Sequence, residues 1–177
     1  GTGKHAFGNT RGTAIKLTGL SSVDPMPVRT LSGINELDLV LGGGLVDSSA
    51  ILVGGDPGIG KSTLLLQAAA KFAQNGMKTL YISGEEATAQ IRLRAKRLEL
   101  TDAHVFLGAE TNLHNILTTL KEEKPNLVII DSIQTVWSDR VDSAPGSISQ
   151  VRATAYELTN FSKVYGISIM LVGHVTK

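Results

Sequence analysis

The sequence predicts an α/β fold with a mostly parallel, twisted sheet and helices on both of its faces. From Ala14 onward, short apolar runs alternate with helical stretches, which is the pattern of repeated βα units. Several of these runs are apolar at successive positions, as expected for strands that are covered on both faces. The length of 177 residues suits one ordinary domain and is too short for two full ones.

The elements follow from the apolar periodicity and from signals at their ends. The expected strands are residues 50–54, 79–83, 105–107, 127–131 and 167–173. The expected helices are residues 61–75, 88–99, 113–123 and 147–165. Gly76 and Gly166 are suited to end two of these helices, and Thr111 and Asn112 are candidate caps for a third. We expect residues 1–14 to be a mobile tail or an artificial remnant, and residues 15–177 to form the folded core.

Composition and charge exclude several classes of site. The chain has no Cys, which excludes disulfides, cysteine nucleophiles, iron–sulfur clusters and a zinc finger within it, and four His make a structural zinc site unexpected. With 17 Lys and Arg against 16 Asp and Glu, polyanion binding would need a local patch. No apolar run reaches the ~20 residues of a membrane span, and the start lacks a signal-peptide core. These features predict a soluble, cytoplasmic protein without a membrane partner.

A phosphate-binding loop follows the first strong strand and leads into a helix. The segment reads GDPGIGKS and matches G-x-x-x-x-G-K-[ST]. Its glycines let backbone N–H groups surround the β-phosphate, and the helix N-terminus adds partial positive charge. Lys61 can reach the β- and γ-phosphates, Ser62 can ligate Mg²⁺, and Thr63 is expected near the α-phosphate. The predicted ATP-binding residues of this loop are Gly55, Asp56, Pro57, Gly58, Ile59, Gly60, Lys61, Ser62 and Thr63.

Asp131 is the candidate second ligand of the metal shell. It ends the buried-type strand LVIID, which is the Walker B form of P-loop enzymes. An aspartate at a strand end commonly just caps a turn. The loop upstream favours the metal-binding interpretation, with Ser62 and Asp131 sharing the Mg²⁺.

Two adjacent carboxylates, Glu85 and Glu86, follow the next strand along the chain. They lie at the carboxyl end of that strand, where parallel sheets bind their ligands. Glu85 is the candidate group that polarises the attacking water, with Glu86 as its structural partner or substitute. Alternatively, both acids merely begin the following helix, where negative charge suits the helix dipole.

The ordered set of motifs resembles the RadA/Sms proteins of bacteria, from about Ala14 to the last residue. The motifs are RTLSGINELD at 29–38, LGGGL at 41–45, GGDPGIGKSTLLLQ at 54–67, YISGEE at 81–86, QIRLRAKRL at 90–98, IIDSIQT at 129–135 and LVGHVTK at 171–177. The resemblance implies a RecA-like P-loop ATPase core and a hexameric ring. It further implies ATP-dependent binding to single-stranded DNA, branch migration of recombination intermediates with DnaB-like motor behaviour, and a RecA-type recombinase as a partner.

The same resemblance assigns roles to individual residues. Glu85 matches the water-activating glutamate of RecA-like ATPases, and Asp131 matches the Walker B aspartate. His174 stands where such proteins place a polar γ-phosphate sensor; otherwise it is a strand-end histidine bonded to backbone. Arg94 is expected either to stack on the adenine or to belong to a solvated helix face.

The resemblance also places two candidate DNA loops. Residues 137–146 correspond to the first loop, where Arg140 or Arg152 could contact phosphates. Two arginines are a thin patch, and solvated charge is the default interpretation of each. Lys177 would open the second loop.

The chain lacks three features of the family. These are an N-terminal four-cysteine zinc finger, a Lys-Asn-Arg-Phe-Gly motif after HVTK, and a Lon-protease-like domain. We therefore expect a central ATPase fragment, truncated at its C-terminal end, that binds ATP and Mg²⁺ but no zinc. Because the residues that complete the site between subunits would lie beyond Lys177, we expect the chain alone to hydrolyse ATP weakly.

Two other function classes remain open at this stage. A KaiC-like branch of signalling ATPases shares the Arg-x-x-Ser/Thr-Gly and Ser-x-x-Glu-Glu features and would use ATP to assemble subunits without a DNA motor. A P-loop kinase is disfavoured because no lid-like arginine cluster follows the Walker B strand.

Overall fold

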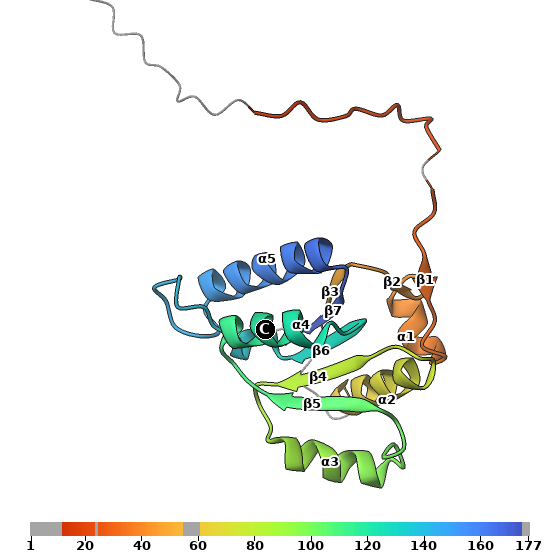
Figure 1. The fold of residues 1–177 in the computed structure, drawn as a ribbon, viewed down its shortest axis with the longest axis vertical. Coiled ribbons are helices and arrows are strands. Elements are labelled where there is room, and N and C mark those ends of the chain that lie inside the picture. The colour runs from red at the N-terminus through yellow and green to blue at the C-terminus, as the bar shows by residue number, and fades with distance from the viewer. Residues whose placement is uncertain (1–11, 24, 55–60, 175–177) are drawn as a thin grey trace, which may run out of the picture.

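A five-stranded parallel sheet forms the centre of the computed structural model, which describes residues 12–23, 25–54 and 61–174 (Figure 1). The strand order is β3-β7-β6-β4-β5, and every pairing is parallel. The strands are β3 (Ala50–Val53), β4 (Thr79–Ser83), β5 (Val105–Ala109), β6 (Leu127–Asp131) and β7 (Ser168–Val172). This arrangement confirms the predicted α/β fold class.

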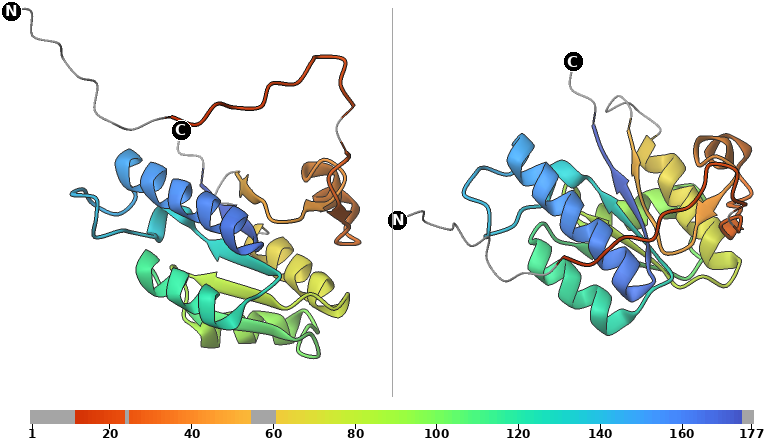
Figure 2. Two further views of the ribbon diagram at one scale, coloured as in Figure 1. Left: turned by 45° about the horizontal axis from the view of Figure 1, so that its top comes forward. Right: turned by 90° about the horizontal axis from the view of Figure 1, so that it is seen from above.

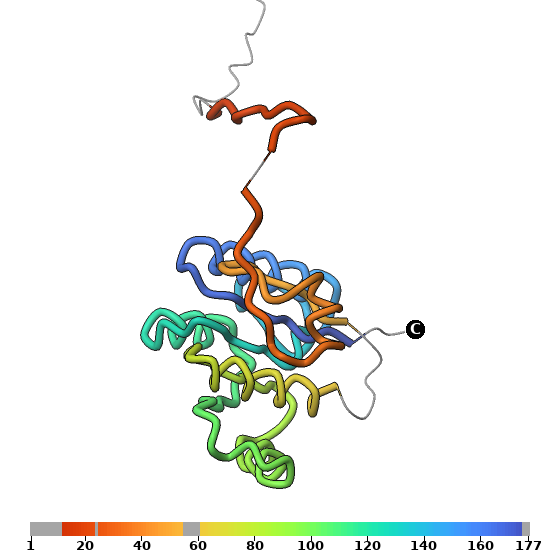
Figure 3. Tube along the Cα trace, turned by 90° about the vertical axis from the view of Figure 1, so that its right-hand side faces the viewer, coloured from red at the N-terminus to blue at the C-terminus, as the bar shows by residue number. Residues whose placement is uncertain are grey.

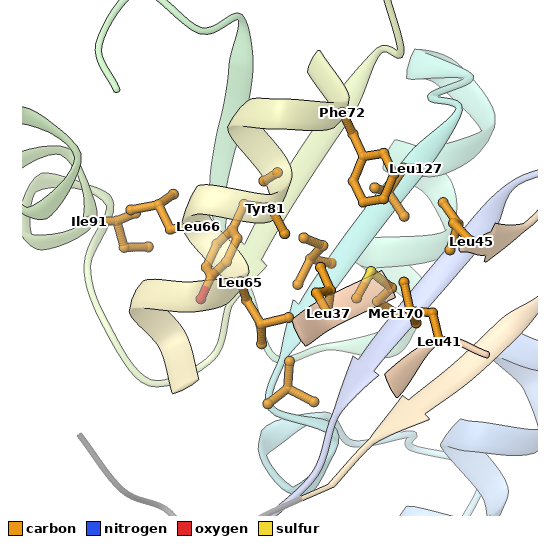
Figure 4. Packing of buried hydrophobic residues seen from close by; sticks show 14 residues of the cluster. Leu37, Leu41, Leu45, Leu65, Leu66, Phe72, Tyr81, Ile91, Leu127 and Met170 are labelled. Carbon is orange, nitrogen blue, oxygen red and sulfur yellow. The ribbon is translucent and has the colours of Figure 1, made fainter. Parts of the chain in front are cut away.

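Helices cover both faces of the sheet (Figures 1 and 2). On one face lie α2 (Lys61–Gln74) and α3 (Thr88–Arg97), and on the other lie α4 (Leu113–Glu123) and α5 (Ile148–Tyr165). Alternate residues of the strands feed two separate apolar clusters, so that Tyr81 and Ile129 pack toward α2 while Ile82 and Ile130 pack toward α4 and α5. Figure 4 shows the first cluster, in which Leu65, Leu66 and Phe72 of α2 meet the sheet. Burial on both faces explains why the strands are apolar throughout.

The register of the sheet places the ends of three strands side by side. Ser83 of β4 pairs with Asp131 of β6, and Asp131 pairs with Val172 of β7. Residues directly after these positions therefore meet at one edge, although they are far apart in the sequence. This edge also faces the start of α2, because Lys61 lies beside Gly173.

Most element ends lie within two residues of their predicted positions. Gly76 (φ 91°) follows α2, and Gly166 (φ 68°) ends α5 with a backbone shape that suits glycine. Asn112 and Ser147 cap α4 and α5 by accepting hydrogen bonds from Asn115 N and Gln150 N.

An N-terminal unit before β3 was not predicted as separate elements. It contains β1 (Arg29–Thr30), α1 (Asn35–Val40) and β2 (Leu45–Val46), and β1 pairs with β2 in antiparallel fashion. The single-turn η1 (Ile133–Thr135) after β6 was also missed. Before Arg29, the described residues form no helix or strand and run away from the body with exposed apolar side chains (Figure 3). Within the described ranges, no helix is long and apolar enough to cross a bilayer.

Candidate nucleotide and metal site

The site begins where α2 starts. The predicted phosphate loop, residues 55–60, lies outside the described residues. Lys61 occupies the first position of α2, and its ammonium donates a hydrogen bond to the carbonyl oxygen of Gly173 after β7. Ser62 and the half-buried Thr63 follow in the first turn. The helix N-terminus and Lys61 together bring positive charge to this edge of the sheet.

Asp131 is buried at the end of β6, and one of its carboxylate oxygens accepts two hydrogen bonds. The Ser62 hydroxyl donates to Asp131 Oδ2 at 3.0 Å, and the Tyr81 hydroxyl donates to the same oxygen at 2.8 Å. Asp131 is 2% exposed, and its Oδ1 is buried without a hydrogen-bond partner among the described residues. Burial, together with the neighbouring Asp131 carboxylate, raises the pKa of Tyr81 well above its usual value, so the phenol stays a donor.

This donor set fits Mg²⁺. The orphaned Asp131 Oδ1 is a carboxylate oxygen left free in a buried position, and the Ser62 hydroxyl lies hydrogen-bonded to the same carboxylate. Hydroxyl and carboxylate oxygens are hard ligands of the kind that Mg²⁺ takes in phosphate-binding sites. Ser62 and Asp131 are thus brought together as the sequence predicts.

Glu85 is held beside Asp131 by two neighbours. Its Oε1 accepts a hydrogen bond from Ser132 Oγ at 2.9 Å, and His174 Nε2 lies 2.9 Å from the same oxygen. Ligand atoms of Glu85, Asp131 and His174 all lie within 4.8 Å of one another. The predicted water-activating group, metal ligand and sensor therefore share one small volume.

His174 is further fixed through its backbone. Gln134 of η1 donates from Nε2 to the His174 carbonyl at 3.2 Å, and its Oε1 accepts from the His174 N–H at 3.3 Å. The His174 ring thus touches Glu85 while its main chain is tied to the segment after β6. His174 therefore connects Glu85 with η1 through hydrogen bonds.

Glu86 and Arg94 form an ion pair next to the site. The Arg94 guanidinium donates to both carboxylate oxygens of Glu86, 2.5 Å from Oε1, and its side chain is only 19% exposed. The hydrogen bond to Glu86 is the main cause that raises the pKa of Arg94. The Arg94 side chain is therefore mostly covered and is paired with the acid that precedes α3. The stacking of Arg94 on adenine and the supporting role of Glu86 stay predictions.

Among the described residues, the predicted DNA contacts take part in none of the hydrogen bonds of this cluster. Arg140 is 80% exposed and lies 3.9 Å from Glu157, while Arg152 is exposed on α5. Residues 138–143, which include Arg140, are held by the buried Gln150. Its side chain accepts a hydrogen bond from Ser138 N and donates to the carbonyls of Ser138, Val141 and Ser143. Lys177 lies outside the described residues.

Sequence reasoning missed three side chains that shape the site, namely Tyr81, Ser132 and Gln134. Tyr81 has the pattern of an ordinary core aromatic, and the other two are polar residues without a distinctive spacing. The one available signal was the burial of Tyr81, since a buried phenol needs a hydrogen-bond partner.

Comparison with known proteins gives a consistent result. The profile of the AAA domain family matches residues 27–177. The DNA repair protein RadA of Brucella abortus is 53% identical over 172 residues, covering 94% of this chain and 37% of that protein. The RadA proteins of Campylobacter jejuni and Escherichia coli are 54% and 51% identical, over 81% and 88% of this chain and 32% and 34% of their own length. The chain thus spans about a third of the length of these curated relatives.

Proposed function

Because the chain belongs to the AAA domain family, in its RadA/Sms branch of ATP-hydrolysing enzymes, we propose that it hydrolyses Mg²⁺-ATP to drive a DNA motor in repair. The observation that carries the proposal is the convergence of Lys61, Ser62, Asp131, Glu85 and His174 at one edge of the sheet. Each of these groups has the charge or hydrogen-bonding capacity that ATP cleavage requires.

Lys61, Glu85 and His174 have different roles in the proposed reaction. Lys61 exchanges the Gly173 carbonyl for the γ-phosphate, where its charge stabilises the oxygens that become more negative during cleavage. Glu85 orients and polarises the attacking water, and Ser132 and His174 hold its carboxylate in place. His174 reports the presence of the γ-phosphate through its contact with Glu85 and its tie to Gln134.

Ser62 and Asp131 would hold Mg²⁺, which when bound neutralises charge on the phosphate oxygens. In the structure, the Ser62 hydroxyl donates a hydrogen bond to Asp131 Oδ2. This bond keeps the two candidate ligands next to each other.

The work that hydrolysis drives is proposed from the relatives, which are named as DNA repair proteins. We propose a cytoplasmic, hexameric DnaB-type motor that grips single-stranded DNA and migrates branched recombination intermediates, with a RecA-type recombinase as partner. Arg140, Arg152 and Lys177 are its candidate phosphate contacts.

The proposal is tested by comparing Glu85→Gln with Glu86→Gln, which make the same chemical change at adjacent positions. Glu85→Gln should bind ATP within about twofold of the original chain yet lower single-turnover phosphate release by roughly 10²- to 10⁴-fold, because the water loses its base. Glu86→Gln should instead lower the melting temperature by weakening the bond to Arg94. Phosphate release and its stimulation by single-stranded DNA are the measurements.

Native hydrolysis by Glu85→Gln would contradict the role of Glu85 and move the candidate base to Glu86. Hydrolysis that single-stranded DNA leaves unchanged, together with salt-insensitive DNA binding, would contradict the motor. Normal assembly and full biological activity of Glu85→Gln would favour the KaiC-like alternative.

A further inference from the structure

The two oxygens of the Asp131 carboxylate have unequal surroundings. Oδ2 receives two hydrogen bonds, from Ser62 and from Tyr81, whereas Oδ1 receives none among the described residues and is buried. A buried carboxylate oxygen without a donor is costly, so its retention points to a ligand that approaches from that side. The unequal hydrogen bonding therefore leaves Oδ1 as the oxygen that is available to a ligand.

Tyr81 is the more deeply buried of the two donors to Oδ2. It lies at the middle of β4, a central strand, with 0% of its surface exposed. Figure 4 shows its ring beside Leu65 and Leu66 of α2, with the hydroxyl oxygen at the end of the ring away from the backbone. Ser62, in contrast, lies in the first turn of α2, directly after the phosphate loop, and is itself a candidate metal ligand.

We propose that Tyr81 is a positioning residue for the metal of bound nucleotide, because its hydroxyl locks Asp131 Oδ2 and so aims Oδ1 at the Mg²⁺ shell. The inference rests on the proposed function, since it requires Mg²⁺-ATP as the ligand. Outer hydrogen bonds of this kind fix the orientation of metal ligands. Without the phenol, the carboxylate is free to rotate and exchange its two oxygens.

A purely structural role for Tyr81 makes a different prediction. If the hydroxyl only satisfied a buried polar atom, its loss would lower stability and leave the Mg²⁺ dependence of nucleotide binding unchanged. Thr79 supplies a matched control on the same strand. Its buried hydroxyl donates to the Met77 carbonyl at the opposite end of β4, away from Asp131.

The test compares Tyr81→Phe and Thr79→Val with the original chain, using a fluorescent ATP analogue titrated with MgCl₂ or in EDTA. Tyr81→Phe should raise the Mg²⁺ concentration at half-maximal enhancement of binding by roughly 10- to 100-fold. Its nucleotide affinity in EDTA should stay within about twofold, because the phosphate loop is unchanged. Thr79→Val should leave both values at those of the original chain.

A second measurement needs no substitution and therefore does not depend on the folding of a variant. The chain has three Tyr, so a ¹³Cζ-tyrosine label gives three signals. The Tyr81 signal should shift when Mg²⁺ is added to the ATP-bound chain, while the signals of the exposed Tyr156 and Tyr165 stay fixed.

Two outcomes separate failure of the inference from failure of the proposed function. The positioning role is overturned if Tyr81→Phe leaves the Mg²⁺ concentration at half-maximal enhancement unchanged, or if the chemical shift of Tyr81 does not change when Mg²⁺ is added. Either result leaves the ATPase proposal intact. If the original chain binds no nucleotide, or binds it equally well with and without Mg²⁺, both the proposed function and the inference are overturned.

Discussion

The Lys61 side chain is hydrogen-bonded to the protein backbone at the position where a phosphate is expected to bind. Its ammonium is bonded to the Gly173 carbonyl at the end of β7, one residue before His174. A backbone carbonyl is a weaker partner for an ammonium than a phosphate is, since only the phosphate carries a full charge. Nucleotide binding would therefore release Gly173 and change the surroundings of His174.

Lys61→Ala is expected to weaken ATP binding by roughly ten- to a hundredfold, because a charge-assisted bond to phosphate is lost. Equilibrium titration with a fluorescent ATP analogue measures this loss. Lys71→Ala, which removes a lysine exposed near the other end of α2, is the control and should bind like the original chain. Equal affinities for the two variants would contradict the phosphate contact of Lys61.

At the scale of elements, the unit before β3 explains the motif RTLSGINELD. The Asp38 carboxylate of α1 accepts hydrogen bonds from Ser32 N, Ser32 Oγ and Gly33 N at 2.8, 2.7 and 3.1 Å. Arg29 donates to the carbonyls of Leu41 and Gly44. Gly44 has a φ of 122°, and a Cβ there would lie 2.8 Å from the Thr30 carbonyl oxygen, so a side chain is excluded. The hydrogen bonds of this motif thus hold α1 against β1 and the turn that leads to β2.

Asp38→Asn is expected to lower the free energy of unfolding by roughly 1.5 to 3 kcal/mol at neutral pH, since hydrogen bonds to a buried charge are lost. Burial alone would raise the pKa of Asp38, but the bonds from Ser32 and Gly33 outweigh it and lower the pKa below its ordinary 3.8. The stabilisation is therefore present above the unfolded-state pKa and lost as pH falls through the folded-state value.

Denaturant unfolding of both chains between neutral pH and pH 3 measures this effect. The difference in stability should shrink as the solution becomes acidic. Glu36→Gln, which changes an exposed carboxylate two residues earlier on α1, is the control. A difference that is independent of pH would show that the charge of Asp38 is not what locks the unit.

At the scale of the whole molecule, the candidate nucleotide site lies at the carboxyl edge of the sheet, and the candidate DNA residues lie on the face that α5 covers. Arg140 and Arg152 belong to the α5 side, whereas α2 and α3 cover the opposite face. The formal net charge is only +1, so DNA binding depends on local placement of charge. The tie between Gln134 and His174 is the direct link between the nucleotide edge and the segment that leads to Arg140.

Replacing both Arg140 and Arg152 by Ala is expected to weaken single-stranded DNA binding and to flatten its dependence on salt. Each lost phosphate contact should reduce the slope of log K against log salt by about 0.7. Fluorescence anisotropy at several salt concentrations measures the slope, with Lys71→Ala on the opposite face as control. An unchanged slope would remove both arginines from the DNA contact.

The sequence alone determined the α/β class, the order of the strands along the chain and the family, because apolar periodicity and glycine-rich motifs are local patterns. The same local patterns predicted Ser62, Asp131 and Glu85, and the structure places these three together. The roles assigned to all the site residues stay predictions, for Ser62 and Asp131 as much as for Glu85, His174 and the candidate DNA contacts.

Only the tertiary structure decided which side chains touch. Tyr81 reaches Asp131 across 50 residues of sequence, and His174 reaches Glu85 across 89. Both contacts depend on the register and order of β4, β6 and β7, which no local pattern encodes. Non-local hydrogen bonds form only once the sheet has aligned its strand ends, and for that reason the positioning residues of this site could not be predicted from the sequence.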